Sequence, residues 1–294
     1  MKPSSAADLA SGKGHKDENF PVASILIARK FRPAIMAFYR FARTADDVAD
    51  NPAAPPAAKL ALLEDMRASL NGESGGSREA VALRQVLAEH SLSNQHALDL
   101  LTAFRQDVTK QRYADWSELI DYCRYSAMPV GRFVLDVHGE SRDTWPANDA
   151  LCAALQIINH LQDCAKDYRE LNRVYLPLDM LERASLSLVV LARDKATLAL
   201  RGVIAELARR TKRLLATARP LASQIRDRRL SLEVAVIQTL AEDLTENLLT
   251  RDPLSERVHH TRGEMAGLLL RSVGHFATAR LRPKRTGIES ASNP

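Results

Sequence analysis

The chain has 294 residues, of which 46% are hydrophobic, 5% are aromatic and 26% are charged, and its formal net charge is +5. This balance excludes global disorder, and the length suits one large domain or two small ones. The small basic excess is scattered along the chain, so we expect solvated helix faces and no nucleic-acid partner.

The cysteines and the apolar runs bear on the cellular compartment. Cys123, Cys152 and Cys164 are an odd number without paired metal-ligand spacing, which predicts reduced thiols and a cytoplasmic location. No apolar run approaches the roughly 20 residues that cross a bilayer, and residues 1–16 lack the apolar stretch of a secretory signal. We therefore expect no membrane-spanning segment. The basic residues near the C-terminus favour a peripheral contact with the inner membrane.

Helical periodicity fills most of the chain, whereas strand alternation and hairpin turns are nearly absent. Breaks rich in Pro, Gly, Asn and Asp fall at 51–56, 71–76, 139–146 and 251–253. We therefore predict an all-α, single-domain fold at residues 17–283, with a disordered or frayed N-terminus at 1–16 and a flexible C-terminal tail at 284–294. The predicted helices run over 33–50, 57–70, 77–90, 94–109, 116–138, 147–171, a short stretch after 177, 195–219, 230–250 and 256–280.

The first informative stretch lies at the end of the first predicted helix. On a helical wheel Tyr39, Arg43, Asp46 and Asp50 fall within about 60° of one another, with Asp47 beside them. Two carboxylates at i and i+4 repel by about 0.2–0.5 kcal/mol, and acids near a helix C-terminus also oppose the macrodipole. A bound cation would offset that cost.

A second polar stripe occurs 117 residues later, measured between the leading aspartates. Gln156, Asn159, Asp163 and Asp167 follow the offsets i, i+3, i+7 and i+11, which places them on one helix face. Facing stripes in a helical bundle form ligand sites, and carboxylate oxygens suit Mg²⁺ ions that bridge to a diphosphate. The alternative for each stripe is a solvated helix face. Asp and Asn are poor helix formers, however, and are less typical of such faces than Glu, Lys and Arg.

These residues resemble the motifs of the squalene/phytoene synthase family of head-to-head prenyl synthases. The likeness extends from about Glu18 to Gly274, and it implies an α-helical isoprenoid synthase bundle with a central channel. The motifs that carry it are Asp46-Asp47-x-x-Asp50 behind Tyr39 and Arg43, Gln156-x-x-Asn159-x-x-x-Asp163-x-x-x-Asp167, and Arg173-Val-Tyr-Leu-Pro177.

The resemblance also implies roles for individual residues. Mg²⁺ as cofactor would be ligated by Asp46, Asp47, Asp50, Asp163 and Asp167. The substrate, a prenyl diphosphate, would be contacted by Tyr39, Arg43 and Arg173, and the catalytic positions near the reacting centre would be Tyr122, Gln156 and Asn159. The segment from Tyr122 to Gly131 resembles the channel helix of the family, whose wall would be lined by Ser126, Ala127, Val130 and Gly131. From the residues themselves, Pro129 should kink this helix.

The chain departs from the family pattern at two positions. Gln162 stands where carotenoid-type members commonly carry Arg, which favours a branch other than phytoene synthesis. Asn172 replaces the usual Gly before Arg173, and because Asn also adopts the left-handed conformation we expect the turn to be retained.

The resemblance implies the ionisation of a prenyl diphosphate with water capture of the rearranged cation and release of pyrophosphate. No glycine motif for a nicotinamide cofactor follows a strand, so we expect no reduction step. One alternative is the condensation of two prenyl diphosphates. Another is a non-catalytic prenyl-lipid-binding or assembly factor, which would be expected to have lost aspartates that this chain retains.

Overall fold

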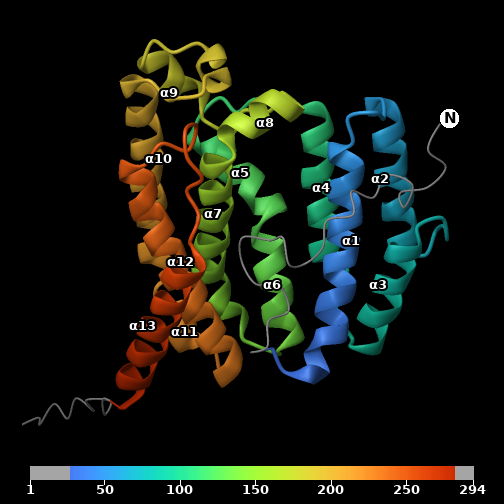
Figure 1. Ribbon diagram of the computed structural model, residues 1–294. Coiled ribbons are helices and arrows are strands. Elements are labelled where there is room, and N and C mark those ends of the chain that lie inside the picture. The colour runs from blue at the N-terminus through green and yellow to red at the C-terminus, as the bar shows by residue number, and fades with distance from the viewer. Residues whose placement is uncertain (1–26, 282–294) are drawn as a thin grey trace, which may run out of the picture.

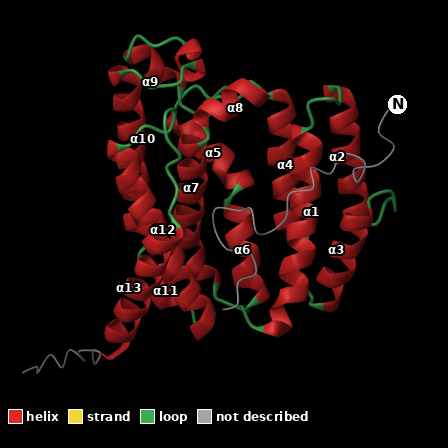
Figure 2. Ribbon diagram, in the orientation of Figure 1, coloured by secondary structure: helices red, strands yellow, loops and turns green. Residues whose placement is uncertain are grey.

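The computed structural model describes residues 27–281, with the side chains of residue 262 and residues 275–281 left out. The predicted termini at 1–16 and 284–294 lie outside the described residues. No strand occurs within residues 27–281, only an isolated bridge between Arg112 and Val174, so the all-α prediction is confirmed (Figure 2). The α-helices are α1 Arg32–Asp50, α2 Pro56–Asn71, α3 Arg78–Glu89, α4 Gln95–Thr109, α5 Trp116–Ser126, α6 Met128–Val137, α7 Trp145–Gln162, α8 Cys164–Leu171, α9 Leu178–Arg183, α10 Leu198–Ala218, α11 Leu221–Gln224, α12 Arg228–Thr250 and α13 Arg262–Leu281.

Two groups of helices flank the middle of the molecule (Figure 1). Helices α1 to α4 pack around residues such as Leu63, whereas α7, α10 and α12 pack around Ile158 and Leu207. Helices α5 and α6 lie between the two groups. Phe133 of α6 stacks on Phe38 of α1 with ring centroids 4.0 Å apart, which joins α6 to the first group. Side chains from both groups therefore face the space between them.

Local sequence signals explain where most helices begin and end. Gly72 ends α2 with a φ of +83°, a left-handed conformation that favours glycine. Side-chain oxygens accept hydrogen bonds from first-turn backbone N–H groups at four N-caps. These caps are Ser77, Asp115, Thr197 and Asp227.

The helix boundaries differ from the prediction in three places. The predicted helix at 116–138 is interrupted at Ala127, directly before Met128-Pro129, which confirms the expected effect of the proline. The predicted helix at 147–171 is interrupted at Asp163, with φ −101° and ψ 8°, and no sequence signal marked that break. The last helix begins at residue 262 and not at 256, because Asp252 holds the preceding segment in a turn. Its backbone carbonyl accepts from the Glu256 N–H, and its side chain accepts from the Ala196 N–H.

Two further expectations concern cysteines and membrane crossing. Cys123, Cys152 and Cys164 are all unpaired, as predicted. Of the helices between residues 27 and 281, none combines the length and the apolar character that a membrane span requires.

Candidate active site

A cavity of about 530 Å³ lies between the two helical groups. Both polar stripes predicted from the sequence line it, from α1 on one side and from α7 and α8 on the other. The stripes therefore face a common space and are not separate solvated surfaces. The predicted site residues that line the cavity are Tyr39, Arg43, Asp46, Asp50, Tyr122, Ser126, Val130, Gly131, Gln156, Asn159, Asp163, Asp167 and Arg173.

Asp47 does not line the cavity, contrary to the prediction of five aspartates around one pocket. Its side chain is 7% exposed, and it accepts a hydrogen bond of 2.7 Å from Nη2 of Arg43. Nη1 of Arg43 donates to Asp46 at 3.0 Å. The turn of the helix that brings Asp46 and Asp50 to the cavity rotates Asp47 away from it, so Asp47 acts on the cavity by holding Arg43.

Ala127 is the second predicted lining residue that the structure places elsewhere. It is buried at the break between α5 and α6, and it is not part of the cavity wall. With φ −126° and ψ −46° the backbone of Ala127 departs from helical geometry two residues before Pro129, so the positions on either side of the break no longer follow one helical wheel. Val130 does line the cavity and is 42% exposed.

Arg173 connects the two acidic helices. Asn172 adopts the predicted left-handed conformation, with φ 52° and ψ 32°, and its side-chain oxygen accepts a hydrogen bond of 2.7 Å from Arg112. The turn directs Arg173 inward, where Nη1 lies 2.6 Å from Oδ1 of Asp50. Nη2 donates to the Ala49 carbonyl at 3.3 Å. Arg173 is 7% exposed, so its charge is held among protein groups.

Asp107 of α4 is a cavity residue that the sequence analysis missed. Its two carboxylate oxygens accept hydrogen bonds from the hydroxyls of Tyr122, at 2.9 Å, and Tyr175, at 3.0 Å. Burial raises the pKa of Asp107 to about 6. A signal was present, because Asp107 follows Leu100 and Ala103 at core-facing offsets in an otherwise apolar helix stripe.

The acidic end of the cavity concentrates negative charge. Enclosure by protein and the neighbouring carboxylate of Asp50 raise the pKa of Asp46 to about 8, although its side chain keeps 36% of its surface accessible. Burial and the charge of Asp163 raise the pKa of Asp167 to about 7. Both shifts mean that ionising these carboxyls costs free energy that a cation would offset.

The donor set at this end fits Mg²⁺ bound together with a phosphate ligand. No three acidic, histidine or cysteine side chains within the described residues form a metal cluster by themselves. Mg²⁺, however, usually keeps several waters and takes one or two carboxylates plus substrate phosphates. The carboxylates of Asp46, Asp50, Asp163 and Asp167 are the hard oxygen donors at this end that would hold such an ion.

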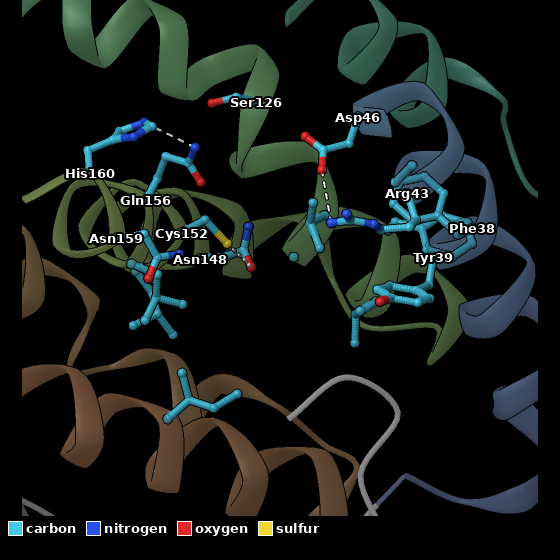
Figure 3. Close-up of a pocket in the computed structure, with 18 of the residues that line it drawn as sticks. Phe38, Tyr39, Arg43, Asp46, Ser126, Asn148, Cys152, Gln156, Asn159 and His160 are labelled. Atoms are coloured by element: carbon cyan, nitrogen blue, oxygen red, sulfur yellow. Dashed lines mark hydrogen bonds and ion pairs between the residues drawn. The ribbon is translucent and has the colours of Figure 1, made fainter. Parts of the chain in front are cut away.

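The middle of the cavity holds a group of polar side chains that includes His160, also missed from the sequence. Nε2 of Gln156 lies 3.1 Å from Nε2 of His160 (Figure 3). The imidazole stacks on the Tyr175 ring with centroids 3.5 Å apart and an interplanar angle of 14°. Burial lowers the pKa of His160 to about 3, with Arg173 adding to the shift, so the ring is neutral near neutral pH.

The opposite end of the cavity is mainly apolar. Gly131 allows α6 to approach α7 closely there, since a Cβ atom would lie 2.1 Å from Oδ1 of Asn148 and 2.6 Å from Sγ of Cys152. The one acidic side chain among the lining residues of this end is the buried Glu233 of α12. The apolar lining residues are Ile27, Ile35, Phe38, Phe133, Val134, Leu151, Leu155, Leu221, Leu230, Val234 and Ile237.

Gln162 lies outside the cavity. Its amide donates to the carbonyl of Val258 in the segment before α13, and its side chain is buried. The residue before Asp163 therefore anchors a neighbouring loop, and it does not contribute to the acidic end.

Comparison with known proteins shows the family to which this chain is related. The sequence profile described as squalene/phytoene synthase matches residues 13–264. The chain is 60% identical over 265 residues to a hydroxysqualene synthase of Zymomonas mobilis, covering 90% of this chain and 89% of that protein. It is 58% identical over 255 residues to a hydroxysqualene synthase of Rhodopseudomonas palustris, covering 87% of each.

Solved structures agree in fold. The crystal structure of squalene synthase HpnC from Alicyclobacillus acidocaldarius matches with a TM-score of 0.69 and 32% identity, covering 83% of this chain and 91% of that one. A dehydrosqualene synthase in complex with a ligand matches with a TM-score of 0.76 at 20% identity, covering 93% and 96%. The second likeness concerns the fold alone.

Proposed function

The chain belongs to the squalene/phytoene synthase family, and we propose that it acts as a hydroxysqualene synthase. It is an enzyme that acts on a prenyl diphosphate. In the proposed reaction presqualene diphosphate ionises, the cyclopropylcarbinyl cation rearranges, and water captures it to give hydroxysqualene and pyrophosphate. The observation that carries the proposal is a single cavity with Asp46, Asp50, Asp163 and Asp167 at one end and an apolar wall at the other.

The acidic end would bind the diphosphate. Mg²⁺ held by Asp46, Asp50, Asp163 and Asp167 would supply positive charge to the departing diphosphate. Arg43 lies in the cavity wall beside Asp46, so its guanidinium is placed to donate to phosphate oxygens. This is electrostatic stabilisation of a leaving group, and it requires little acid or base work from the protein.

The residues around Arg173 would keep the acidic end in a fixed arrangement. Arg173 holds the Asp50 carboxylate, and it also donates through Nε to the Asp107 carbonyl at 3.2 Å. Asp107 in turn orients the Tyr122 hydroxyl. Preorganised groups of this kind cost no reorganisation during the reaction.

The apolar end would bind the hydrocarbon chains and exclude bulk water from the cation. Val130 and Gly131 contribute to that wall, next to Leu151 and Leu155. The absence of a side chain at Gly131 lets the wall close tightly against α7. A carbocation formed there meets only the water that the protein holds in place.

The proposal is tested by supplying purified protein and Mg²⁺ with presqualene diphosphate alone and with farnesyl diphosphate alone. We expect consumption of the first, with hydroxysqualene and pyrophosphate as products, and no product from the second. Turnover of farnesyl diphosphate without turnover of presqualene diphosphate would establish the condensing reaction instead. Binding of either compound without release of pyrophosphate would establish the non-catalytic alternative.

We also propose that α13 rests on an anionic membrane surface. Met265, Leu269, Leu270 and Val273 leave 38%, 38%, 76% and 47% of their surface exposed on this helix. The sequence from residue 265 to residue 288 contains five basic residues and no acidic one. Exposed apolar side chains on a helix with basic residues in the adjoining sequence are complementary to anionic headgroups, and the unpaired cysteines support a reducing, cytoplasmic side for this contact.

A further inference from the structure

His160 lies one helical turn after Gln156 on α7, and the two side chains touch. The 3.1 Å contact joins Nε2 of the amide to Nε2 of the imidazole. The ring is fixed on its other side, because it stacks on Tyr175 at 3.5 Å and is 8% exposed. The position of the Gln156 amide is therefore set by a rigid neighbour.

The orientation of the Gln156 amide, with its nitrogen toward the ring, sets the direction of this hydrogen bond. An amide nitrogen can only donate, so Nε2 of His160 must accept and the ring proton must be on Nδ1. Nδ1 faces the carboxylate of Asp167, at 3.9 Å from Oδ2, which favours a proton on that atom. With its nitrogen turned to the ring, Gln156 directs its carbonyl oxygen away from His160 and into the cavity (Figure 3).

A second polar atom faces the same cavity without a partner. Oγ of Ser126, at the end of α5, is buried and has no hydrogen-bond partner within residues 27–281. A hydroxyl donates and accepts, whereas the Gln156 carbonyl only accepts. A buried water typically makes about three hydrogen bonds, and these two groups offer it a donor and two acceptors.

The position of Gln156 along the cavity determines which part of a bound substrate it would meet. Gln156 on α7 precedes Asp163, the residue at which that helix ends, by seven residues, which is about 10 Å along the helix axis. A prenyl diphosphate bound at the acidic end would extend its carbon skeleton toward this level of the cavity. Leu155 and Cys152 of the same helix line the cavity nearby, so a water held there would have few other polar partners on α7.

We propose that His160 is a positioning residue for water capture: it holds the Gln156 amide so that Oε1, together with Oγ of Ser126, binds the water that ends the reaction. The inference rests on the proposed function. The C–O bond to the diphosphate breaks, and the electron pair leaves with the diphosphate. The water oxygen forms a new C–O bond to the cation, and its proton passes to the released pyrophosphate. No atom is oxidised or reduced overall.

The test measures hydroxysqualene and pyrophosphate in the same reaction, started with presqualene diphosphate and Mg²⁺. For the wild-type protein we expect the two in nearly equal amounts. In His160→Leu the alcohol should fall about fivefold relative to pyrophosphate, which corresponds to the loss of one hydrogen bond of about 1 kcal/mol. The missing carbon should appear as hydrocarbon formed by proton loss. In His160→Gln the ratio should recover, because the amide oxygen reaches the position of Nε2.

Two further variants separate positioning from stability. His96→Leu removes another buried histidine, one that contacts Asp136 and does not line the cavity; it should leave the product ratio unchanged. Gln156→Met keeps the length of the side chain and removes the carbonyl, so its ratio should fall as in His160→Leu. This variant decides the question if His160→Leu does not fold.

An unchanged ratio in His160→Leu or in Gln156→Met, with hydroxysqualene still formed, would overturn the inference and leave the proposed function intact. Pyrophosphate release by the wild-type protein without any hydroxysqualene would instead overturn the proposed function.

Discussion

Arg173 and Asp50 are 123 residues apart in the chain, and their side chains form an ion pair of 2.6 Å at the acidic end of the cavity. The contact joins the segment after α8 to the end of α1. The guanidinium is buried, and it also binds the backbone carbonyls of Ala49 and Asp107. One side chain therefore fixes the separation of the two acidic helices.

Arg173→Met should destabilise the protein strongly and abolish pyrophosphate release. The Arg173 side chain is buried but that of Asp50 is 37% exposed, so the cost should lie between the roughly 1 kcal/mol of a surface pair and the roughly 3–5 kcal/mol of a fully buried one. The free energy of unfolding, measured by denaturant titration, checks this value. The matched control is Arg183→Met, which breaks the exposed 3.1 Å pair with Asp179 and should cost less than about 1 kcal/mol. Equal losses in the two variants would contradict the assigned role of Arg173.

The aspartates should differ in their effects according to whether they line the cavity. Asp46→Asn and Asp163→Asn each remove a carboxylate proposed to bind Mg²⁺, so kcat should fall by about 10²-fold or more. Asp47→Asn weakens the 2.7 Å support of Arg43 and should raise KM more than it lowers kcat. Steady-state pyrophosphate release at several Mg²⁺ concentrations distinguishes the two effects. The metal assignment fails if Asp46→Asn keeps the Mg²⁺ dependence of the wild-type protein.

Binding of Mg²⁺ and pyrophosphate should release protons near neutral pH. The pKa of Asp46 is raised to about 8 and that of Asp167 to about 7, so the metal-free protein holds protons there that its unfolded chain would lose. Bound Mg²⁺ requires ionised carboxylates. Affinity should therefore rise with pH from about pH 6 to pH 8 and level off above the raised pKa values. Calorimetric titration in buffers of different ionisation enthalpy measures the released protons, and a heat that does not depend on the buffer would refute the prediction.

The same raised pKa values give the sign of the stability change for the metal-free protein. A carboxyl whose pKa is higher in the folded state stabilises the fold below its unfolded pKa, and this contribution is lost as pH rises through the folded value. For Asp46 and Asp167 the loss therefore begins near the unfolded pKa value of 3.8 and is complete at the folded values of about 8 and about 7. Asp46→Asn should remove part of that pH dependence, as measured by thermal melts without Mg²⁺.

Gly131→Ala should destabilise the protein by about 1–3 kcal/mol, because the new methyl group would overlap Asn148 and Cys152. Gly202→Ala in α10 serves as the control. Nothing lies within 4 Å of a Cβ atom at Gly202, and Ala favours the helix, so this change should stabilise by about 0.4–1 kcal/mol. Melting temperatures that shift in the same direction would contradict the close packing of α6 on α7.

The proposed membrane contact is tested by vesicle flotation with anionic and with zwitterionic lipids. The double variant Leu270→Glu, Val273→Glu should lose binding to anionic vesicles. The control double variant Val189→Glu, Leu198→Glu changes residues that are 51% and 86% exposed on elements other than α13 and should bind as the wild-type protein does. Binding of the wild-type protein should weaken at high salt. Concentration-dependent self-association that is lost in the α13 variant, without vesicle binding, would identify a second copy as the occupant.

The sequence predicted the helices well because each one depends on its own hydrophobic periodicity and on the residues that begin and end it. Asn172 and Pro129 acted as expected from their individual backbone preferences. The contributions of Asp107 and His160 were not visible in the same way. Asp107 owes its importance to Tyr122 and Tyr175, which reach it through tertiary packing. His160 is a wheel neighbour of Gln156, and its role depends on the Tyr175 ring that packs against it from another part of the chain.

The position of Asp47 shows the limit of motif reasoning. Three aspartates in one motif share a role by resemblance, yet a helix turns by about 100° per residue, so adjacent acids face different surroundings. Asp46 faces the cavity and Asp47 faces the protein interior beside Arg43. On the helical wheel Asp47 lies beside the polar stripe. The packing of α1 places its side chain outside the cavity.

Ionisation of presqualene diphosphate followed by capture of the cation by water is the central step of the proposed reaction. It is tested by running the reaction with Mg²⁺ in water enriched in the heavy oxygen isotope and analysing the alcohol by mass spectrometry. We predict hydroxysqualene that carries the heavy isotope, with an equal amount of pyrophosphate. An alcohol that retains the cyclopropane skeleton and light oxygen would show P–O cleavage without a cation, and would contradict the account.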